Sequence, residues 1–473
     1  MTLVKLHPDA FSRFYDGVGY IVNQFTRTNN LFDINELDYL KAIARIPRDT
    51  DDIVADLQIQ IPHIPVDQIK ANFCKLVVVL ENEKLVVTGE SLEELKTNES
   101  VAYEKPYNIL EQGNTVQSIN PAIFFYSYFD KHPTLFASQI DLTSHCNFTC
   151  RHCFYPPERI PVSLDTGLVF DVLDQLAEMG TLIVTFSGGE PLLHKDFGKI
   201  LLKARRNDFI ITIQSNAFLV DERVTEYLRE ANVCTFQTSL YSMKPDDHDR
   251  ITGLPGSLKK TLQGIELVGQ SSIPICVGCH VMKSNRHSYM SVLEWSAKRG
   301  VRCMVDFFMM ARSNFCTENL GESLNMKDTE EVTREMLQYE NKYVEFGKSI
   351  KKASIDINSF RNKPICDAGK SMLYISSDGD CYPCAGFVGY NVGNVRQLPV
   401  KDIWNNSDML SRLRSVTWND FPECLECEAF QYCSMCFARN FNENKGNMLK
   451  HTSHQCDITH LNMRVATERW FKS

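Results

Sequence analysis

The chain has 473 residues, 17 of them cysteine, and its 50 basic against 59 acidic side chains give a formal charge of −9. That balance argues against a nucleic-acid or anionic-membrane partner, because neutralising phosphates takes an excess of Lys and Arg. The N-terminus lacks the apolar stretch of a signal peptide, and no window holds the roughly 18 apolar residues of a membrane span, so we expect a cytoplasmic protein. Thiols stay reduced there, which favours metal-binding or reactive cysteines over disulfides.

Residues 1–100 predict a small α+β domain. The turn Asp16-Gly17 lies between strand-like residues 11–15 and 18–22 and so indicates a hairpin. Helices are predicted at Ile34–Ala44, Asp51–Leu57 and Asp67–Leu80, followed by a strand or wing at Lys84–Thr88. A winged DNA-binding domain would have this pattern, but 10 basic against 16 acidic residues over 1–100 disfavour DNA. Residues 101–134 are predicted to be a linker.

From 135 to 315 strands and helices alternate, which predicts an α/β fold of the (β/α)6 type: a parallel sheet curved into a partial TIM-like barrel. The strands are expected at Ala137–Leu142, Leu182–Phe186, Phe209–Gln214, Val233–Leu240, Ile275–Val281 and Arg302–Met309. The helices are expected at Leu164–Glu178, Phe197–Arg206, Glu222–Glu230, Leu258–Val268 and Tyr289–Lys298. Function is then expected at the carboxyl-terminal ends of the strands.

The last third of the chain has a different composition. Residues 316–362 predict a helical bridge, with a charged amphipathic helix from Lys327 to about Lys351. Residues 363–473 are turn-rich and dense in cysteine, which is typical of a domain whose small core is held by metal.

Three cysteines follow the first barrel strand, in the pattern Cys146-x3-Cys150-x2-Cys153. Three soft ligands suit a [4Fe–4S] cluster with one iron left open, whereas structural zinc would need a fourth ligand, which His145 or His152 could supply. Spacing alone leaves both interpretations open. The second strand runs into Ser187-Gly188-Gly189-Glu190-Pro191, where glycines allow close backbone approach and a carboxylate can accept from an ammonium.

The three-cysteine loop followed by Gly-Gly-Glu-Pro resembles the radical S-adenosylmethionine (SAM) superfamily. The resemblance implies that Cys146, Cys150 and Cys153 hold a [4Fe–4S] cluster whose open iron binds SAM, the source of a 5′-deoxyadenosyl radical that abstracts hydrogen from the substrate. It also implies SAM contacts: His152 beside the adenine, Gly188, Gly189 and Glu190 at the methionine amino group, and Ser215, Asn216 and Ser239 at the ribose or carboxylate. The alternative for the last three is ordinary strand-end capping.

A second cysteine array has the spacings Cys366-x12-Gly379-x4-Cys384, then Cys424-x2-Cys427-x5-Cys433-x2-Cys436, then Cys456. A zinc ribbon needs roughly 15 to 20 residues between its two pairs, and here five separate them. The array resembles the SPASM extension of radical SAM enzymes, which carries two auxiliary [4Fe–4S] clusters and would bring the total to three.

The resemblance implies a division of these cysteines between the two auxiliary clusters. Cys424, Cys427, Cys433 and Cys456 would ligate the distal cluster, and Cys366, Cys384 and Cys436 the proximal one. The spacing between Cys433 and Cys436 is one residue shorter than in the family, and Cys381 is additional. Either Cys381 is the fourth proximal ligand or one iron is open to substrate.

The first 100 residues resemble a PqqD-like element that grips the leader of a ribosomally synthesised precursor peptide. The leading hypothesis is therefore a radical SAM peptide maturase that forms a thioether or carbon–carbon crosslink, with flavodoxin or ferredoxin as electron donor. Alternatives are a peptide epimerase, with Cys316 as hydrogen donor, and oxidation of Cys or Ser as in sulfatase maturases. A non-enzymatic iron–sulfur redox sensor is a further alternative, but it has no need of the Gly-Gly-Glu-Pro motif.

Overall fold

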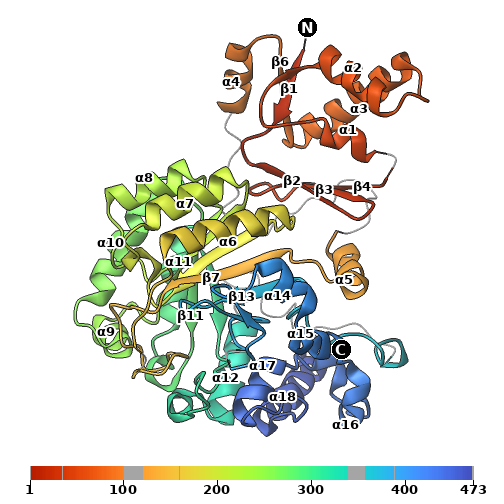
Figure 1. The fold of residues 1–473 in the computed structure, drawn as a ribbon. Coiled ribbons are helices and arrows are strands. Elements are labelled where there is room, and N and C mark those ends of the chain that lie inside the picture. Colours follow the sequence, from red (N-terminus) through yellow and green to blue (C-terminus); the bar gives the residue numbers. More distant parts are fainter. Residues whose placement is uncertain are drawn as a thin grey trace.

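The computed structural model describes residues 2–34, 36–100, 121–158, 160–338, 357–387 and 389–470. An N-terminal domain lies at one end of a central α/β barrel, and a largely helical C-terminal region packs on the barrel's other side (Figure 1). Within these ranges no helix is both long and apolar enough to cross a lipid bilayer.

The N-terminal domain has two three-stranded sheets, ordered β5-β1-β6 and β2-β3-β4, and a helical layer. Its strands are β1 (Leu3–Leu6), β2 (Ala10–Tyr15), β3 (Val18–Asn23), β4 (Asn29–Phe32), β5 (Arg48–Asp49) and β6 (Val86–Gly89). Its helices are α1 (Leu37–Lys41), α2 (Thr50–Gln60), α3 (Val66–Asn82) and α4 (Leu92–Ser100). The predicted hairpin is confirmed, with Gly17 at φ 71° in its turn. α1 is shorter than predicted.

The N-terminal domain packs against the amino-terminal ends of the barrel strands, opposite the end where function is expected. Phe11 and Tyr20 share a buried cluster with Leu182 and Ile210, which lie at the starts of barrel strands. Arg45 pairs with Asp208 at 2.5 Å, which adds an ionic contact to the apolar interface. Helix α5 (Pro121–Lys131) lies within the predicted linker and contributes aromatic side chains to this cluster, while residues 101–120 of that linker lie outside the described residues.

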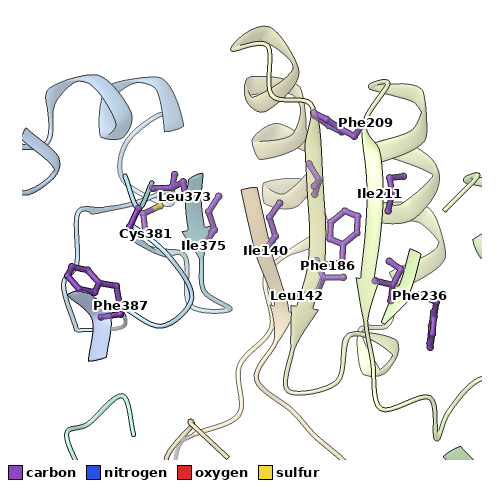
Figure 2. Close-up of a cluster of buried hydrophobic side chains, with 14 of the residues drawn as sticks. Ile140, Leu142, Phe186, Phe209, Ile211, Phe236, Leu373, Ile375, Cys381 and Phe387 are labelled. Carbon is purple, nitrogen blue, oxygen red and sulfur yellow. The ribbon is translucent and has the colours of Figure 1, made fainter. Parts of the chain in front are cut away.

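The six predicted barrel strands are confirmed as parallel neighbours in the order β12-β11-β10-β9-β8-β7. They are β7 (Ala137–Thr143), β8 (Ile183–Gly188), β9 (Ile210–Gln214), β10 (Thr235–Ser239), β11 (Ile275–His280) and β12 (Arg302–Asp306). The covering helices are α6 (Thr166–Glu178), α7 (Phe197–Arg206), α8 (Glu222–Glu230), α9 (Pro245–Thr252), α10 (Ser257–Gln270) and α11 (Met290–Lys298). The core between the sheet and its helices includes Ile140, Phe186, Ile211 and Phe236 (Figure 2).

The C-terminal region extends the barrel sheet beyond its first strand. β13 (Met372–Ile375) pairs in parallel with β7, and β14 (Asp380–Tyr382) and β15 (Gly393–Asn394) follow antiparallel. One nine-stranded sheet therefore crosses the domain boundary predicted at residue 363. The remaining helices are α12 (Met326–Gln338), α14 (Val400–Asn406), α15 (Asp408–Ser415), α16 (Pro422–Leu425), α17 (Phe437–Glu443) and α18 (Ser453–Trp470). The predicted bridge helix begins as α12, and its part from 339 to 351 lies outside the described residues.

Candidate active site and cysteine sites

The loop after β7 carries Cys146, Cys150 and Cys153 at the carboxyl-terminal end of the barrel. Cys146 is exposed and the other two are half-buried. Burial raises the pKa of Cys150, and the neighbouring thiols of Cys153 and Cys146 raise it further. A bound metal cation would lower the pKa of these thiols, because it favours the thiolate form.

The glycines at the end of β8 lie directly against the cysteine loop. The Gly189 N–H donates to the Thr143 carbonyl at 2.8 Å, and the Glu190 N–H donates to the His145 carbonyl at 2.7 Å. A Cβ on Gly189 would stand 2.1 Å from the His145 oxygen, and one on Gly188, at φ 134°, 2.2 Å from the Thr143 oxygen. Only glycine permits this approach.

The Glu190 carboxylate is completely buried and joins its own segment to the loop after β9. It accepts hydrogen bonds from the Ser215 hydroxyl at 2.7 Å, the Asn216 N–H at 2.8 Å and the Leu192 N–H at 3.1 Å. Burial raises the pKa of Glu190 to about 7, although these donors oppose the shift. The Asn216 amide also donates to the Asn147 side chain in the cysteine loop at 2.7 Å. Ser215 and Asn216, predicted to contact SAM, therefore also fix Glu190 and the cysteine loop.

Two aromatic side chains that the sequence analysis did not assign to the site pack against His152. Its ring lies edge-on to Tyr241 at 4.9 Å and stacks on His280 at 5.8 Å. Burial lowers the pKa of His152 to about 3, so the imidazole is neutral. Tyr241 lies two residues beyond Ser239, the last residue of β10, and His280 ends β11. Their position at strand ends is the signal that could have identified them.

These residues fit an iron–sulfur cluster with a small ligand beside it. The loop that carries the three cysteines lies against the two glycines, and the buried Asn147 Nδ2 and His152 Nδ1 atoms have no hydrogen-bond partner within the described structure. No three His, Cys, Asp or Glu side chains of the described ranges lie close enough to share one ion. A [4Fe–4S] cluster takes one thiolate on each of three irons and leaves the fourth iron open, which suits a loop that offers three cysteines.

Four cysteines of the C-terminal region line one apolar cavity. They are the predicted distal ligands Cys424, Cys427, Cys433 and Cys456. Burial raises the pKa of Cys424 to about 12, and the other three thiols contribute to the shift. His460 lies 3.8 Å from the Cys427 sulfur and also lines the cavity.

The three predicted proximal ligands form a separate group. Burial raises the pKa of Cys384 to about 12, with contributions from Cys436 and Cys366. Cys433 therefore lies with the distal cysteines and Cys436, three positions later, lies with the proximal ones. This is the division that the resemblance implies.

The structure does not bring Cys381 together with these thiols. Its side chain is completely buried in the apolar core beside Leu373 and Ile375 (Figure 2). Burial raises the pKa of Cys381 to about 12, and the neighbours that act on it are Asp380 and the Val395 backbone.

Cys316 lies in the loop that follows β12. It is half-buried, and its sulfur accepts from Arg312 at 3.9 Å. In the same loop the Ser313 N–H donates to the Phe154 carbonyl, just beyond the cysteine loop, at 3.1 Å. Cys316 therefore lies in a loop at the same end of the barrel as the cysteine loop.

Comparison with known proteins agrees with this geometry. A model of the radical SAM superfamily matches residues 140–296, and a model of an iron–sulfur cluster-binding domain, SPASM, matches residues 366–428. An AdoMet-dependent heme synthase of Methanosarcina barkeri is 26% identical over 326 residues, covering 64% of this chain and 90% of that protein. A PqqA peptide cyclase of Granulibacter bethesdensis is 25% identical over 302 residues, covering 61% and 78%.

The fold is similar to that of Streptococcus suis SuiB bound to its precursor peptide SuiA, with a TM-score of 0.62 and 17% identity over 95% of this chain and 99% of SuiB. The predicted radical SAM-type partial barrel and cysteine-rich C-terminal region are thereby confirmed. The chain therefore carries a radical SAM domain and an iron–sulfur cluster-binding SPASM domain, preceded by an N-terminal domain that lies outside both matched ranges.

Proposed function

We propose that this protein is a radical SAM enzyme that abstracts hydrogen from a ribosomally synthesised precursor peptide and closes an intramolecular thioether or carbon–carbon crosslink. The observation that carries the proposal is the joining, in one chain, of the cysteine loop and glycine cradle to an N-terminal domain whose sheet ends in the outer strand β4. The heme synthase match covers 64% of the chain, whereas the SuiB fold covers 95% and so includes most of the N-terminal domain.

The residues around the cysteine loop would bind and orient the cofactors. Cys146, Cys150 and Cys153 would hold a [4Fe–4S] cluster, and Gly188 to Glu190 would cradle the methionine end of SAM. When bound, these groups supply the 5′-deoxyadenosyl radical. Burial raises the pKa of the Glu190 carboxyl group to about 7. An ammonium group beside it would offset the free-energy cost of burying the charged carboxylate.

Crosslink formation removes one hydrogen atom, one proton and one electron from the peptide. The cysteine groups of the C-terminal region would hold two [4Fe–4S] clusters, one on the four distal cysteines and another on Cys366, Cys384 and Cys436. These clusters would accept the electron. Because Cys381 is buried in the core, the proximal group offers three thiols. One iron of a cluster held there would then be free to bind a group of the substrate.

The N-terminal domain would hold the peptide leader between β4 and α3. β4 is an outer strand of its sheet, so an extended leader can pair with it. The Thr28 hydroxyl donates to the Glu83 carbonyl at 2.7 Å, which holds the start of β4 at the end of α3. One turn earlier on α3, Val78 and Val79 are 57% and 50% exposed. A helix with exposed apolar side chains beside an outer strand suits an amphipathic leader strand.

Replacing Val79 by Asp should weaken leader binding about 10- to 100-fold, because burying a valine side chain contributes about 1.5–3 kcal/mol and each 1.4 kcal/mol is tenfold. The measurement is fluorescence anisotropy with a labelled leader peptide. Ile59→Asp is the matched control, because Ile59 is 79% exposed but lies on α2. Equal weakening in both variants would contradict the placement of the leader beside α3.

The enzymatic proposal is tested by anaerobic reconstitution with iron, sulfide, SAM and dithionite. We expect 5′-deoxyadenosine to form, and its formation to be coupled to a change in the peptide. If the reconstituted protein produces no 5′-deoxyadenosine, the enzymatic proposal fails and the redox-sensor alternative is favoured.

A further inference from the structure

Two side-chain amides join the cysteine loop to the loop after β9. The Phe218 N–H donates to the Asn216 Oδ1 atom at 3.0 Å. Because a backbone N–H can only donate, this bond identifies the oxygen of the Asn216 amide and leaves the amide nitrogen free to donate elsewhere. That nitrogen donates to the Asn147 Oδ1 atom at 2.7 Å. The orientation of both amides is therefore fixed by hydrogen bonds within the chain.

This fixed orientation leaves the amide nitrogen of Asn147 without a partner. The Asn147 Nδ2 atom is buried and makes no hydrogen bond within the described residues. Flipping the Asn147 amide would not satisfy it, since two nitrogens would then face each other at the contact with Asn216. An unpaired buried donor is unfavourable, so we expect an acceptor here that the chain itself does not supply.

The segments that carry the two amides are also held by packing. The rings of Phe148 and Phe218 meet edge-on with their centroids 5.6 Å apart, and the side chain of Phe148 is buried. The Thr261 hydroxyl donates to the Asn216 carbonyl at 3.0 Å, which ties the loop after β9 to α10. The position of Asn147 therefore does not depend on a bound ligand.

Asn216 also relates Asn147 to the Glu190 carboxylate. Its backbone N–H donates to the Glu190 Oε2 atom at 2.8 Å, and its side chain donates to Asn147. One residue thus holds a buried acceptor, suited to a cation, and a buried donor, suited to an anion. The methionine end of SAM carries an ammonium and a carboxylate on the same carbon atom, and such a pair of protein groups would bind both.

We infer that Asn147 is a SAM-binding residue that donates from its Nδ2 atom to the carboxylate of SAM. The inference rests on the proposed function, in which Gly188 to Glu190 cradle the methionine end of SAM. In this arrangement the Asn216 amide orients Asn147. A hydrogen bond to a charged group is stronger than one between neutral groups, so its loss should weaken SAM binding about 10- to 100-fold.

The test is Asn147→Asp, which keeps an oxygen to accept from Asn216 but removes the donor and adds a negative charge. The dissociation constants of SAM and of decarboxylated SAM, which lacks only the carboxylate, are measured by equilibrium dialysis on oxidised, reconstituted protein, where no turnover occurs. We expect SAM to bind about 10- to 100-fold more weakly, with iron per chain unchanged and the affinity for decarboxylated SAM not lowered. Asn391→Asp is the matched control, because Asn391 is exposed and its Oδ1 atom accepts from the Gly393 N–H at 2.8 Å.

A second variant, Asn147→Ala, removes the donor without adding a charge and should also weaken the binding of SAM alone. Equal weakening for the two ligands, or an unchanged affinity for SAM in a variant that holds iron, would overturn the inference. If neither variant holds iron, equal affinities of the unmodified protein for SAM and decarboxylated SAM would overturn it. Absence of SAM binding by the unmodified protein would instead contradict the proposed function, so the two failures are distinguishable.

Discussion

Replacing any one of Cys146, Cys150 and Cys153 by Ala should abolish 5′-deoxyadenosine formation while leaving the iron of the C-terminal region in place. The three thiols lie in a single loop, and with only two of them the cluster would lose one of its three protein ligands. The C-terminal cysteines lie in separate groups with their own neighbours, so their iron should be unaffected.

This result is measured by chromatography of the nucleoside product and by iron and sulfide analysis of the same sample. Cys74→Ala is the control, because Cys74 is an exposed thiol on α3 of the N-terminal domain. Iron should fall by the content of one cluster in each of the three variants and stay constant in the control. Full turnover in any of the three would show that the cluster lies elsewhere.

Replacing Gly189 by Ala should lower SAM cleavage about 100-fold with iron retained, because a displacement of about 1 Å near reacting groups has an effect of that size. The new Cβ would stand 2.1 Å from the His145 oxygen, 2.5 Å from its carbonyl carbon and 2.6 Å from the Ser144 oxygen. These are backbone atoms, so no side chain can rotate away. The glycine cradle must move off the cysteine loop and carry Glu190 with it.

The matched control for this substitution is Gly321→Ala, since a Cβ at Gly321 meets no atom within 4 Å and its φ is not positive. The decisive comparison is 5′-deoxyadenosine formation at saturating SAM against iron per chain. Loss of both iron and activity in Gly189→Ala would mean that the loop collapses rather than that SAM is misplaced. Activity equal to that of Gly321→Ala would contradict the cradle.

The barrel could be predicted well from sequence because its signals are local. α7 and α8 begin and end where expected, since each combines an amphipathic pattern with turn residues on both sides. α9 was missed because it has little apolar periodicity; Pro245 at its start and Gly253 at its end define it instead. The last barrel strand ends at Asp306, three residues earlier than predicted, because the apolar run continues into a loop.

The pairing of β13 with β7 could not be predicted, because it joins residues about 235 positions apart that no local pattern relates. The same limit applies to the site. Cysteine spacing indicates which thiols belong to each group, but the packing of His152 against Tyr241 and His280 depends on how separate loops pack in space. The burial of Cys381 likewise follows from its place on β14 within the extended sheet, which the sequence analysis did not anticipate.

Mass spectrometry of a precursor peptide coexpressed with this protein tests the account most directly. The candidate substrate is a short peptide encoded beside its gene, and the control is the same peptide coexpressed with the Cys150→Ala variant. The account predicts a product lighter by two hydrogen atoms, with fragment ions that remain joined between two residues, and no such product in the control. A peptide of unchanged mass that contains a D-residue would contradict crosslink formation and establish the epimerase alternative.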